Sequence, residues 1–349
     1  MAQGVSGPGW IPRTAAHSDH RPPVAFGTTP DGPGYGGGVF TEGDRAARSG
    51  RARDAAVAAA RGLGLTVRDA RVLHDVFSVV VRLDPAPVVA RVPVVVPRAV
   101  TPAVRAGYQR AELAVTAWLA GRGAPTVVPS PLVPAEPVRH GGFAMTFWER
   151  VDGVTESTLD LPEQVALTAR LHSVLRDYPG EPRLFAALEH GVEDGFHQLA
   201  DRPDLLAPED VDRARREWAV LGPLTTSADA FRAEFPDATL QPVHGDAPYH
   251  NLIETPDRVY HCDFEHVMLG PVEWDLTHVG ARALAAYDAA AAPLGLRPAD
   301  PRLLRAMVAL RDLQMLSFLA LAPEMPLLVE GLQPMVAEWR GSEFAGGLG

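Results

Sequence analysis

The sequence predicts an α+β fold in two parts: a meander of strands with one inserted helix, followed by a mainly helical part. Runs rich in β-branched residues gather between residues 65 and 148, with one stretch of helical spacing among them. Beyond residue 148 the apolar residues recur mostly at helical spacing. The 349 residues fit one large domain or two ordinary ones, and a hydrophobic content of 46% is enough to bury a substantial core.

The chain begins with a segment of different composition, residues 1 to about 50. It is rich in Gly and Pro and shows no apolar periodicity. Such a segment buries too little apolar surface to offset the entropy of ordering it, so residues 1–50 are predicted to form a flexible tail. A GxGxxG match occurs in it at Gly32, Gly34 and Gly37, but nothing apolar precedes Gly32. A dinucleotide site needs a strand there, so we interpret the match as part of the tail.

Residues 51–148 are predicted as the first structured part. A short helix opens it over Ala55–Gly62, because Gly62 and Gly64 end the helical spacing. Short β-branched runs, bounded by turn residues, predict strands. These runs lie at Leu65–Leu73, Val76–Leu83, Val88–Val96 and Phe143–Trp148. Between the third and the fourth run a helix is predicted over about 102–119, since two glycines follow it.

Residues 149–349 are predicted as the second part. Its helix-like spacing occurs at Ala166–Leu175, Val211–Leu221, Thr277–Ala290 and Leu303–Leu319. A short β-rich insertion, Gln241–Asp263, interrupts these helices, and we expect a hairpin within it. The whole chain is therefore divided at about residues 50 and 148.

Composition excludes several classes of protein. The net charge of −11 argues against a nucleic-acid binder held by phosphate contacts and permits a cationic small-molecule ligand. No apolar stretch is long enough for a membrane span or a signal peptide, and the single cysteine, Cys262, cannot form an internal disulfide. We therefore expect a cytoplasmic protein without a membrane partner, and its oligomeric state stays open. All 32 basic residues are arginine, which rules out mechanisms that require a lysine.

The segment 243–280 carries the residues that indicate a chemistry. Asp246, Asn251, Asp263 and Glu265 lie within it, and a hairpin there would gather them at one end. A carboxylate on a loop can accept the proton of a substrate hydroxyl and orient that hydroxyl for attack. An amide oxygen and a second carboxylate are hard ligands that suit Mg²⁺. Phosphoryl transfer needs little more from a protein than positioning and charge neutralisation, so this reaction fits the segment.

The same segment resembles the aminoglycoside phosphotransferase family, which shares a protein-kinase-like fold with the choline kinases. His244-Gly245-Asp246 with Asn251 is similar to the family's catalytic loop, and Asp263-Phe264-Glu265 with Trp274-Asp275-Leu276 is similar to its metal motif. The resemblance covers about residues 55–340. It implies a small antiparallel-sheet N-lobe and a mainly helical C-lobe with ATP between them. It further implies Asp246 as the catalytic base, Asn251 and Asp263 as Mg²⁺ ligands assisted by Glu265, and Asp275 as a brace for the loop.

Upstream, the resemblance implies residues that bind the phosphates of ATP. Arg91, in the run Val88–Val92, stands where the family uses a lysine, and arginine can carry that charge with a different geometry. Glu112, in the following helix, would be its ion-pair partner. The turn His74–Ser78 would cover the phosphates and includes Ser78, although it contains no glycine to allow a close backbone approach.

Other parts of the resemblance concern adenine and the helical lobe. Met145–Glu149 resembles the segment that hydrogen-bonds adenine, which implies contacts from Phe147 and Glu149. Leu171-His172 is similar to a frequent helix motif of the second lobe. Ala247-Pro248 departs from the family's usual pair in the catalytic loop, and this proline stiffens the loop without removing a catalytic group.

Taken together, these residues imply an ATP- and Mg²⁺-dependent phosphotransferase that acts on a hydroxyl of a small molecule. The acceptor is an aminoglycoside-like antibiotic or a metabolite such as a sugar, an amino alcohol or homoserine. A non-catalytic nucleotide-binding regulator is the alternative, because of the glycine-free turn and Arg91, although the complete Asp246, Asn251 and Asp263 set argues against it. Acidic residues of the C-terminal third would suit a cationic acceptor or simply a solvated surface: Glu324, Glu330, Glu338 and Glu343.

Overall fold

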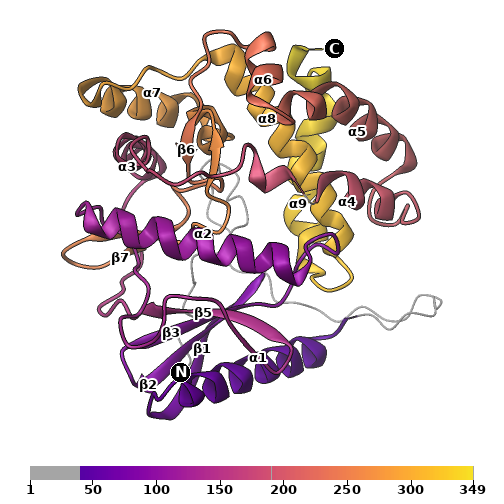
Figure 1. Cartoon of the computed structure of the whole chain (residues 1–349). Coiled ribbons are helices and arrows are strands. Elements are labelled where there is room, and N and C mark those ends of the chain that lie inside the picture. The colour runs from indigo at the N-terminus through magenta and orange to yellow at the C-terminus, as the bar shows by residue number, and fades with distance from the viewer. Residues whose placement is uncertain (1–39, 190, 349) are drawn as a thin grey trace.

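The computed structural model describes residues 40–189 and 191–348, which form two lobes (Figure 1). One lobe holds a sheet covered by helix α1, the other is mainly helical, and helix α2 lies between them. This arrangement confirms the predicted α+β fold with a sheet lobe followed by a helical lobe. Most of the predicted tail, including the glycines at 32–37, lies outside the described residues.

Helix α1 (Glu42–Gly62) begins earlier than the predicted helix over 55–62. Thr41 caps it: the Thr41 side chain accepts a hydrogen bond from the backbone of Asp44 at 3.2 Å, and the Asp44 carboxylate accepts one from the backbone of Thr41 at 2.9 Å. The buried residues of α1 are small, mostly alanine, and pack on the sheet. Residues 42–50 are therefore helical, and their small and charged side chains gave no apolar periodicity by which to recognise them.

The sheet lobe is built on five antiparallel strands in the order β1-β2-β3-β5-β4. They are β1 (Val67–Asp75), β2 (Ser78–Pro85), β3 (Val88–Pro93), β4 (Val138–His140) and β5 (Phe143–Glu149). The four predicted strands are confirmed. Strand β4 was not predicted, because three residues after a proline-rich connection are too few to show alternation. Inward side chains of β2, β3 and β5 form one buried cluster with α1.

Helix α2 (Pro102–Gly121) confirms the predicted helix and joins the lobes. Thr101 caps its first turn by accepting a hydrogen bond from the backbone of Val104, with Pro102 at the first helical position. Residues of α2 and α3 share a buried apolar cluster with Phe264. This cluster fixes α2 against the helical lobe, and so it fixes the position of the buried Glu112.

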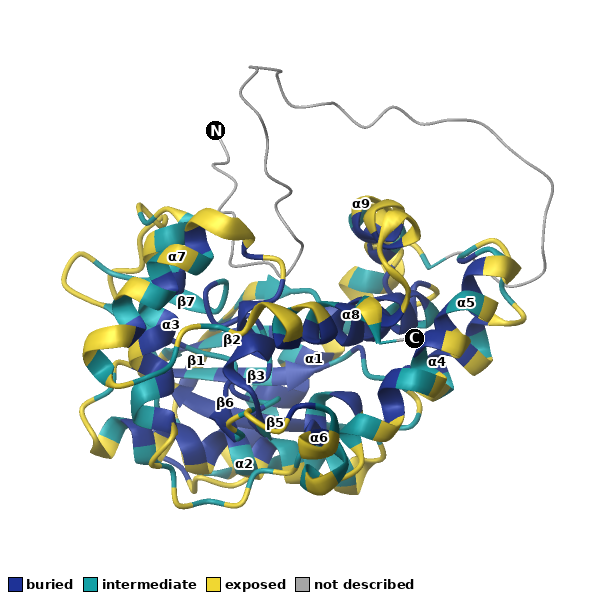
Figure 2. Ribbon diagram, turned by 90° about the horizontal axis from the view of Figure 1, so that it is seen from above, coloured by how far each residue is buried: buried dark blue, intermediate teal, exposed yellow. Residues whose placement is uncertain are grey.

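The helical lobe contains α3 (Leu161–Leu175), α4 (Val192–Leu199), α5 (Pro208–Leu221), α6 (Ala228–Glu234), α7 (Gly280–Ala291), α8 (Pro301–Ser317) and α9 (Leu327–Gly341). Short 3₁₀ turns lie at η1 (Ala186–Leu188), η2 (Gly222–Thr225), η3 (Val272–Leu276), η4 (Ala292–Leu294), η5 (Phe318–Leu321) and η6 (Phe344–Gly347). The four predicted helices are confirmed with shifted ends. Helices α4 and α6 escaped prediction because they are short, and α9 because Pro334 interrupts it. Figure 2 shows α8 as a largely buried helix.

Two small antiparallel sheets lie between α6 and α7. β7 (Leu252–Glu254) pairs with β8 (Val259–His261), which is the predicted hairpin, and β6 (Gln241–Val243) pairs with β9 (Met268–Gly270). The loops that follow β6 and β8 carry the catalytic-loop and metal motifs of the sequence, so these sheets set the position of both. In the described ranges, no helix combines the length and apolarity needed to cross a membrane.

Candidate active site

The loop between β6 and β7, residues 244–251, turns sharply at Gly245. The backbone of Gly245 has φ +85°, and a Cβ placed there would lie 1.8 Å from the carbonyl oxygen of His266. Both the left-handed conformation and the close approach require glycine. The glycine therefore brings the loop after β6 directly against the loop after β8.

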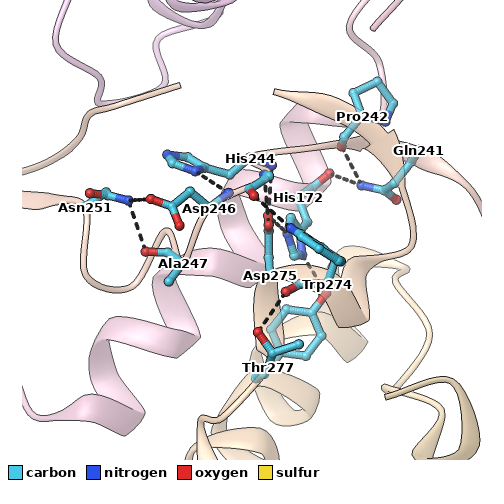
Figure 3. A network of polar contacts seen from close by, with 12 residues as sticks. His172, Gln241, Pro242, His244, Asp246, Ala247, Asn251, Trp274, Asp275 and Thr277 are labelled. Carbon is cyan, nitrogen blue, oxygen red and sulfur yellow. Dashed lines mark hydrogen bonds and ion pairs between the residues drawn. The ribbon is translucent and has the colours of Figure 1, made fainter. Parts of the chain in front are cut away.

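Asp275 holds this turn from beneath (Figure 3). Its side chain is fully buried, one oxygen accepts from the backbone of His244 at 2.8 Å, and the other accepts from the backbone of Gly245 at 2.9 Å. The neighbouring Trp274 donates its indole N–H to the Gly245 carbonyl at 2.7 Å. Consecutive residues of η3 thus bind the backbone on both sides of the turn, in agreement with the bracing role that the sequence implies for Asp275.

Two buried histidines complete the support of the loop. His172 Nε2 lies 2.9 Å from Asp275 Oδ2, and His172 Nδ1 lies 2.9 Å from the Tyr287 hydroxyl. His244 Nε2 lies 2.9 Å from the Cys262 carbonyl, which can only accept, so Nε2 carries the proton. Nδ1 of His244 is then free to accept from the backbone of Asp246 at 3.4 Å. His244 therefore supports the loop by hydrogen bonding.

Asp246 points away from this support with its side chain 15% exposed. Its Oδ2 accepts a hydrogen bond from Asn251 Nδ2 at 3.2 Å, and the same Asn251 amide donates to the Ala247 carbonyl at 3.3 Å. Because the nitrogen of the Asn251 amide is used within the loop, its oxygen is the atom available to a cation. A partly exposed carboxylate held by one amide can accept a proton from a bound hydroxyl.

Arg91 of β3 lies at the centre of a second polar group, which we call the Arg91 cluster: Arg91, Glu112, Asp263 and Glu265. Nη2 of Arg91 lies 2.8 Å from Asp263 Oδ1 and 2.9 Å from Glu265 Oε1. Nη1 donates to Glu265 Oε2 at 2.9 Å and lies 3.4 Å from Glu112 Oε2. The contact with Glu112 that the sequence implied is therefore present, and Arg91 also joins the sheet lobe to the metal motif.

The carboxylates of the Arg91 cluster repel one another. Burial raises the pKa of Glu112 above its ordinary value, and the neighbouring Asp263 and Glu265 raise it further. Burial likewise raises the pKa of Asp263, with Glu265 and Asp246 adding repulsion. Burial also opposes ionisation of Glu265, but the adjacent Arg91 outweighs it and lowers the pKa of Glu265 to about 2. Three acidic groups around one guanidinium therefore make the ionisation of all three unfavourable, and a divalent cation would relieve that repulsion.

The oxygen atoms of Asn251, Asp263 and Glu265 are of the kind that Mg²⁺ prefers. Asn251 supplies an amide oxygen, and Asp263 and Glu265 supply carboxylates that are 34% and 24% exposed. Asp263 has φ +63°, a left-handed conformation that is uncommon for a residue other than glycine. Within the described ranges, no group of three or more His, Cys, Asp or Glu could hold a metal alone.

Other residues singled out in the sequence lie elsewhere. Ser78 is the buried first residue of β2, and the turn before it carries Phe77, whose ring lies 6.1 Å from that of Phe318 in the helical lobe. Phe147 and Glu149 lie within β5, and their backbones already bond to neighbours: Ser130 donates to the Phe147 carbonyl, and Glu149 donates to Val128. The contact of Ser78, Phe147 and Glu149 with a nucleotide stays a prediction.

Sequence reasoning missed Arg311 of α8, which lies 3.7 Å from Asp246 Oδ1. Its signal was available: Arg311, Asp312 and Gln314 interrupt the apolar run of residues 306–316, and buried charged residues are rare unless paired. Its partners could not be read from the sequence, because the ion pair with Asp246 and the hydrogen bond to the Gly245 carbonyl, 66 residues away, join distant segments.

Comparison with known proteins adds to this geometry. The model of the phosphotransferase enzyme family matches residues 79–307. No curated protein matches the sequence. Among solved structures, a choline kinase, LicA, from Streptococcus pneumoniae is similar with a TM-score of 0.54 at 13% identity, covering 81% of this chain and 98% of its own. The GDP and kanamycin complex of APH(2")-IIia is similar with a TM-score of 0.52 at 14% identity, covering 82% and 98%.

A third solved structure is the AMP-bound complex of spectinomycin phosphotransferase, APH(9)-Ia. Its TM-score is 0.50 at 11% identity, and the match covers 79% of this chain and 93% of that one. At such identities these likenesses establish the fold, which is the two-lobed kinase-like one.

Proposed function

Since the chain belongs to the phosphotransferase enzyme family, we propose that it transfers the γ-phosphoryl group of ATP to a hydroxyl of a small molecule, with Mg²⁺. One observation carries this proposal: Arg91 of the sheet lobe contacts Asp263 and Glu265, and the loop that holds these carboxylates lies against the loop of Asp246. The backbone N–H of Cys262 donates to the Asn251 carbonyl at 3.0 Å, and the Asn251 amide donates to Asp246 at 3.2 Å. Together these residues supply the parts that phosphoryl transfer needs, namely a proton acceptor, metal ligands and a phosphate-binding cation.

Each residue has a role in the proposed reaction. Asp246 accepts the proton of the acceptor hydroxyl and aims that oxygen at the phosphorus. Arg91 binds the phosphates through its planar guanidinium, and Glu112 keeps that guanidinium in place. Asn251, Asp263 and Glu265 would hold Mg²⁺, which neutralises charge that develops on the phosphate oxygens. Asp275, Trp274 and His172 support the loop and take no part in the chemistry.

The acceptor is proposed as a small polar molecule with a free hydroxyl. Similar structures include a complex with kanamycin, a choline kinase and a spectinomycin phosphotransferase, and this supports an aminoglycoside-like antibiotic or an amino alcohol. The net charge of −11 is compatible with a cationic acceptor. We propose a cytoplasmic location because the chain has a single cysteine and cannot form an internal disulfide.

The Arg91 cluster predicts that nucleotide and metal bind together. ATP without metal must displace Asp263 and Glu265 from Arg91 and meets their negative charge, whereas Mg²⁺ takes up those carboxylates and frees the guanidinium. In a thermal-shift assay we expect Mg²⁺–ATP at a hundred times its dissociation constant to stabilise the protein by about 2.7 kcal/mol. ATP with EDTA should shift the melting temperature by less than a quarter as much.

A matched pair of variants makes this assay specific. Arg91→Gln should lose the shift, while Arg82→Gln, which removes an arginine of β2 that pairs with Asp84, should keep it. An equal shift with EDTA and with Mg²⁺ would contradict the proposed metal ligands. Binding of Mg²⁺–ATP without transfer to any acceptor would favour the alternative of a non-catalytic regulator, which Arg91 and the glycine-free turn His74–Ser78 motivate.

A further inference from the structure

Arg311 is a buried guanidinium that the Arg91 cluster does not use. It lies on α8 with its side chain 5% exposed, among the buried residues of that helix. Burying a cation is costly unless hydrogen bonds and opposite charge compensate it. Arg311 therefore needs partners that compensate its charge.

Its contacts converge on the catalytic loop. Nη2 donates to the Gly245 carbonyl at 3.3 Å, the same oxygen that receives the Trp274 indole N–H. The guanidinium carbon lies 4.2 Å from the centre of the Trp274 ring, within cation–π range. Nη1 donates to Gln314 at 3.0 Å, and Gln314 donates in turn to the Ala187 carbonyl at 2.8 Å. Gln314 and the Trp274 ring thus hold the guanidinium of Arg311, and its Nη2 contacts the catalytic loop.

The same guanidinium faces the proposed base. Nη1 lies 3.7 Å from Asp246 Oδ1, while Oδ2 of Asp246 accepts from Asn251. One oxygen of the carboxylate therefore faces a fixed positive charge, and the other is hydrogen bonded. Together with the bond to Gly245, these contacts fix both the main chain and the carboxylate orientation at Asp246.

Resting on the proposed phosphotransferase function, we propose that Arg311 is a positioning residue: it sets the direction of the Asp246 carboxylate through its ion pair and its bond to Gly245. It acts through Asp246 and touches no substrate in this role. Its effect belongs to turnover rather than to nucleotide binding, because the Arg91 cluster that would bind the nucleotide contacts other residues.

Three variants test this role. Arg311→Gln removes the charge, and Arg311→Lys keeps the charge but loses the planar stacking on Trp274. Arg297→Gln is the matched control: it breaks a buried ion pair with Glu273, the residue beside Trp274, without contact to Gly245 or Asp246. Hydrogen exchange measures the loop without any acceptor. We expect the amides of 244–251 to exchange at least about fivefold faster in Arg311→Gln, and within twofold of the wild type in Arg297→Gln.

The rate of turnover distinguishes a positioning role of Arg311 from a role in stability alone. With phosphate release from Mg²⁺–ATP as the readout, Arg311→Gln should lower kcat at least tenfold and leave KM for ATP within twofold, with Arg311→Lys between. In an Asp246→Asn background, Arg311→Gln should lower the residual rate by less than twofold, because its effect passes through Asp246. A structural role alone would lower the rate equally in both backgrounds.

Unchanged loop exchange in Arg311→Gln, or a full additional loss in the Asp246→Asn background, would overturn the proposal. Should Arg311→Gln not fold, Arg311→Lys decides by the same measures: wild-type loop exchange and kcat overturn the role, and a faster-exchanging loop with lower kcat supports it. Absence of phosphate release from the wild type bears on the proposed function, whereas the exchange experiment still tests Arg311.

Discussion

Replacing Asp246 by asparagine should lower the rate of phosphoryl transfer about a thousandfold, because the amide cannot accept the proton of the acceptor hydroxyl. The fold should persist, since Asp246 is partly exposed and Arg311, which loses its ion pair, keeps its hydrogen bonds to Gly245 and Gln314. The rate is measured by transfer of label from γ-labelled ATP, and the fold by the melting temperature.

A second aspartate provides the control for this experiment. Asp257 is exposed in the turn between β7 and β8, close in sequence to the site but outside its contacts. Asp257→Asn should retain the wild-type rate. If Asp246→Asn kept more than a tenth of the activity, a different residue would have to accept the proton.

Asp275→Asn should cost about 3 kcal/mol of unfolding free energy and most of the activity. The Asp275 carboxylate receives two backbone N–H groups and lies 2.9 Å from His172 Nε2, all in a fully buried setting. An asparagine has one side-chain oxygen, whereas the backbone N–H groups of His244 and Gly245 need two acceptors. Its NH₂ group would therefore face one of these donors. Urea unfolding measures the stability, and γ-phosphate transfer measures the activity.

Asp210 is a buried aspartate far from the loop and serves as the comparison. It pairs with Arg340 of α9. Asp210→Asn should lose stability but keep kcat, since its partners do not touch the loop. Equal loss of kcat in both variants would mean that the activity follows overall stability rather than the position of Gly245 and Asp246.

The sequence allowed much of the fold to be predicted where signals are local. Strands β1, β2, β3 and β5 carry β-branched runs, and α2 ends at glycines, so each could be recognised within a window of a few residues. The first part of helix α1, residues 42–54, could not be recognised, because its buried residues are a serine and an alanine that carry little hydrophobic signal. The proline within α9 and the three-residue length of β4 hid those elements in the same way.

The residues of the site likewise differ in whether a local sequence pattern reveals them. The Asp246, Asn251 and Asp263 motif is compact in sequence, so the family resemblance pointed to it, as it did to Arg91 and Glu112. The contact of Arg91 with Glu265 spans 174 residues, and that of Arg311 with Gly245 spans 66, so neither leaves a local pattern. Only the packing of β3 and α8 around the two loops determines these contacts.

The most direct test of the account is transfer of label from γ-labelled ATP with Mg²⁺ to a panel of aminoglycosides, other antibiotics, sugars and amino alcohols. The wild-type protein and the Asp246→Asn variant are compared on each compound. We predict that the wild type labels a hydroxyl of at least one acceptor and that the variant labels the same acceptor about a thousandfold more slowly. Labelling of that acceptor by the variant at the wild-type rate would contradict the account.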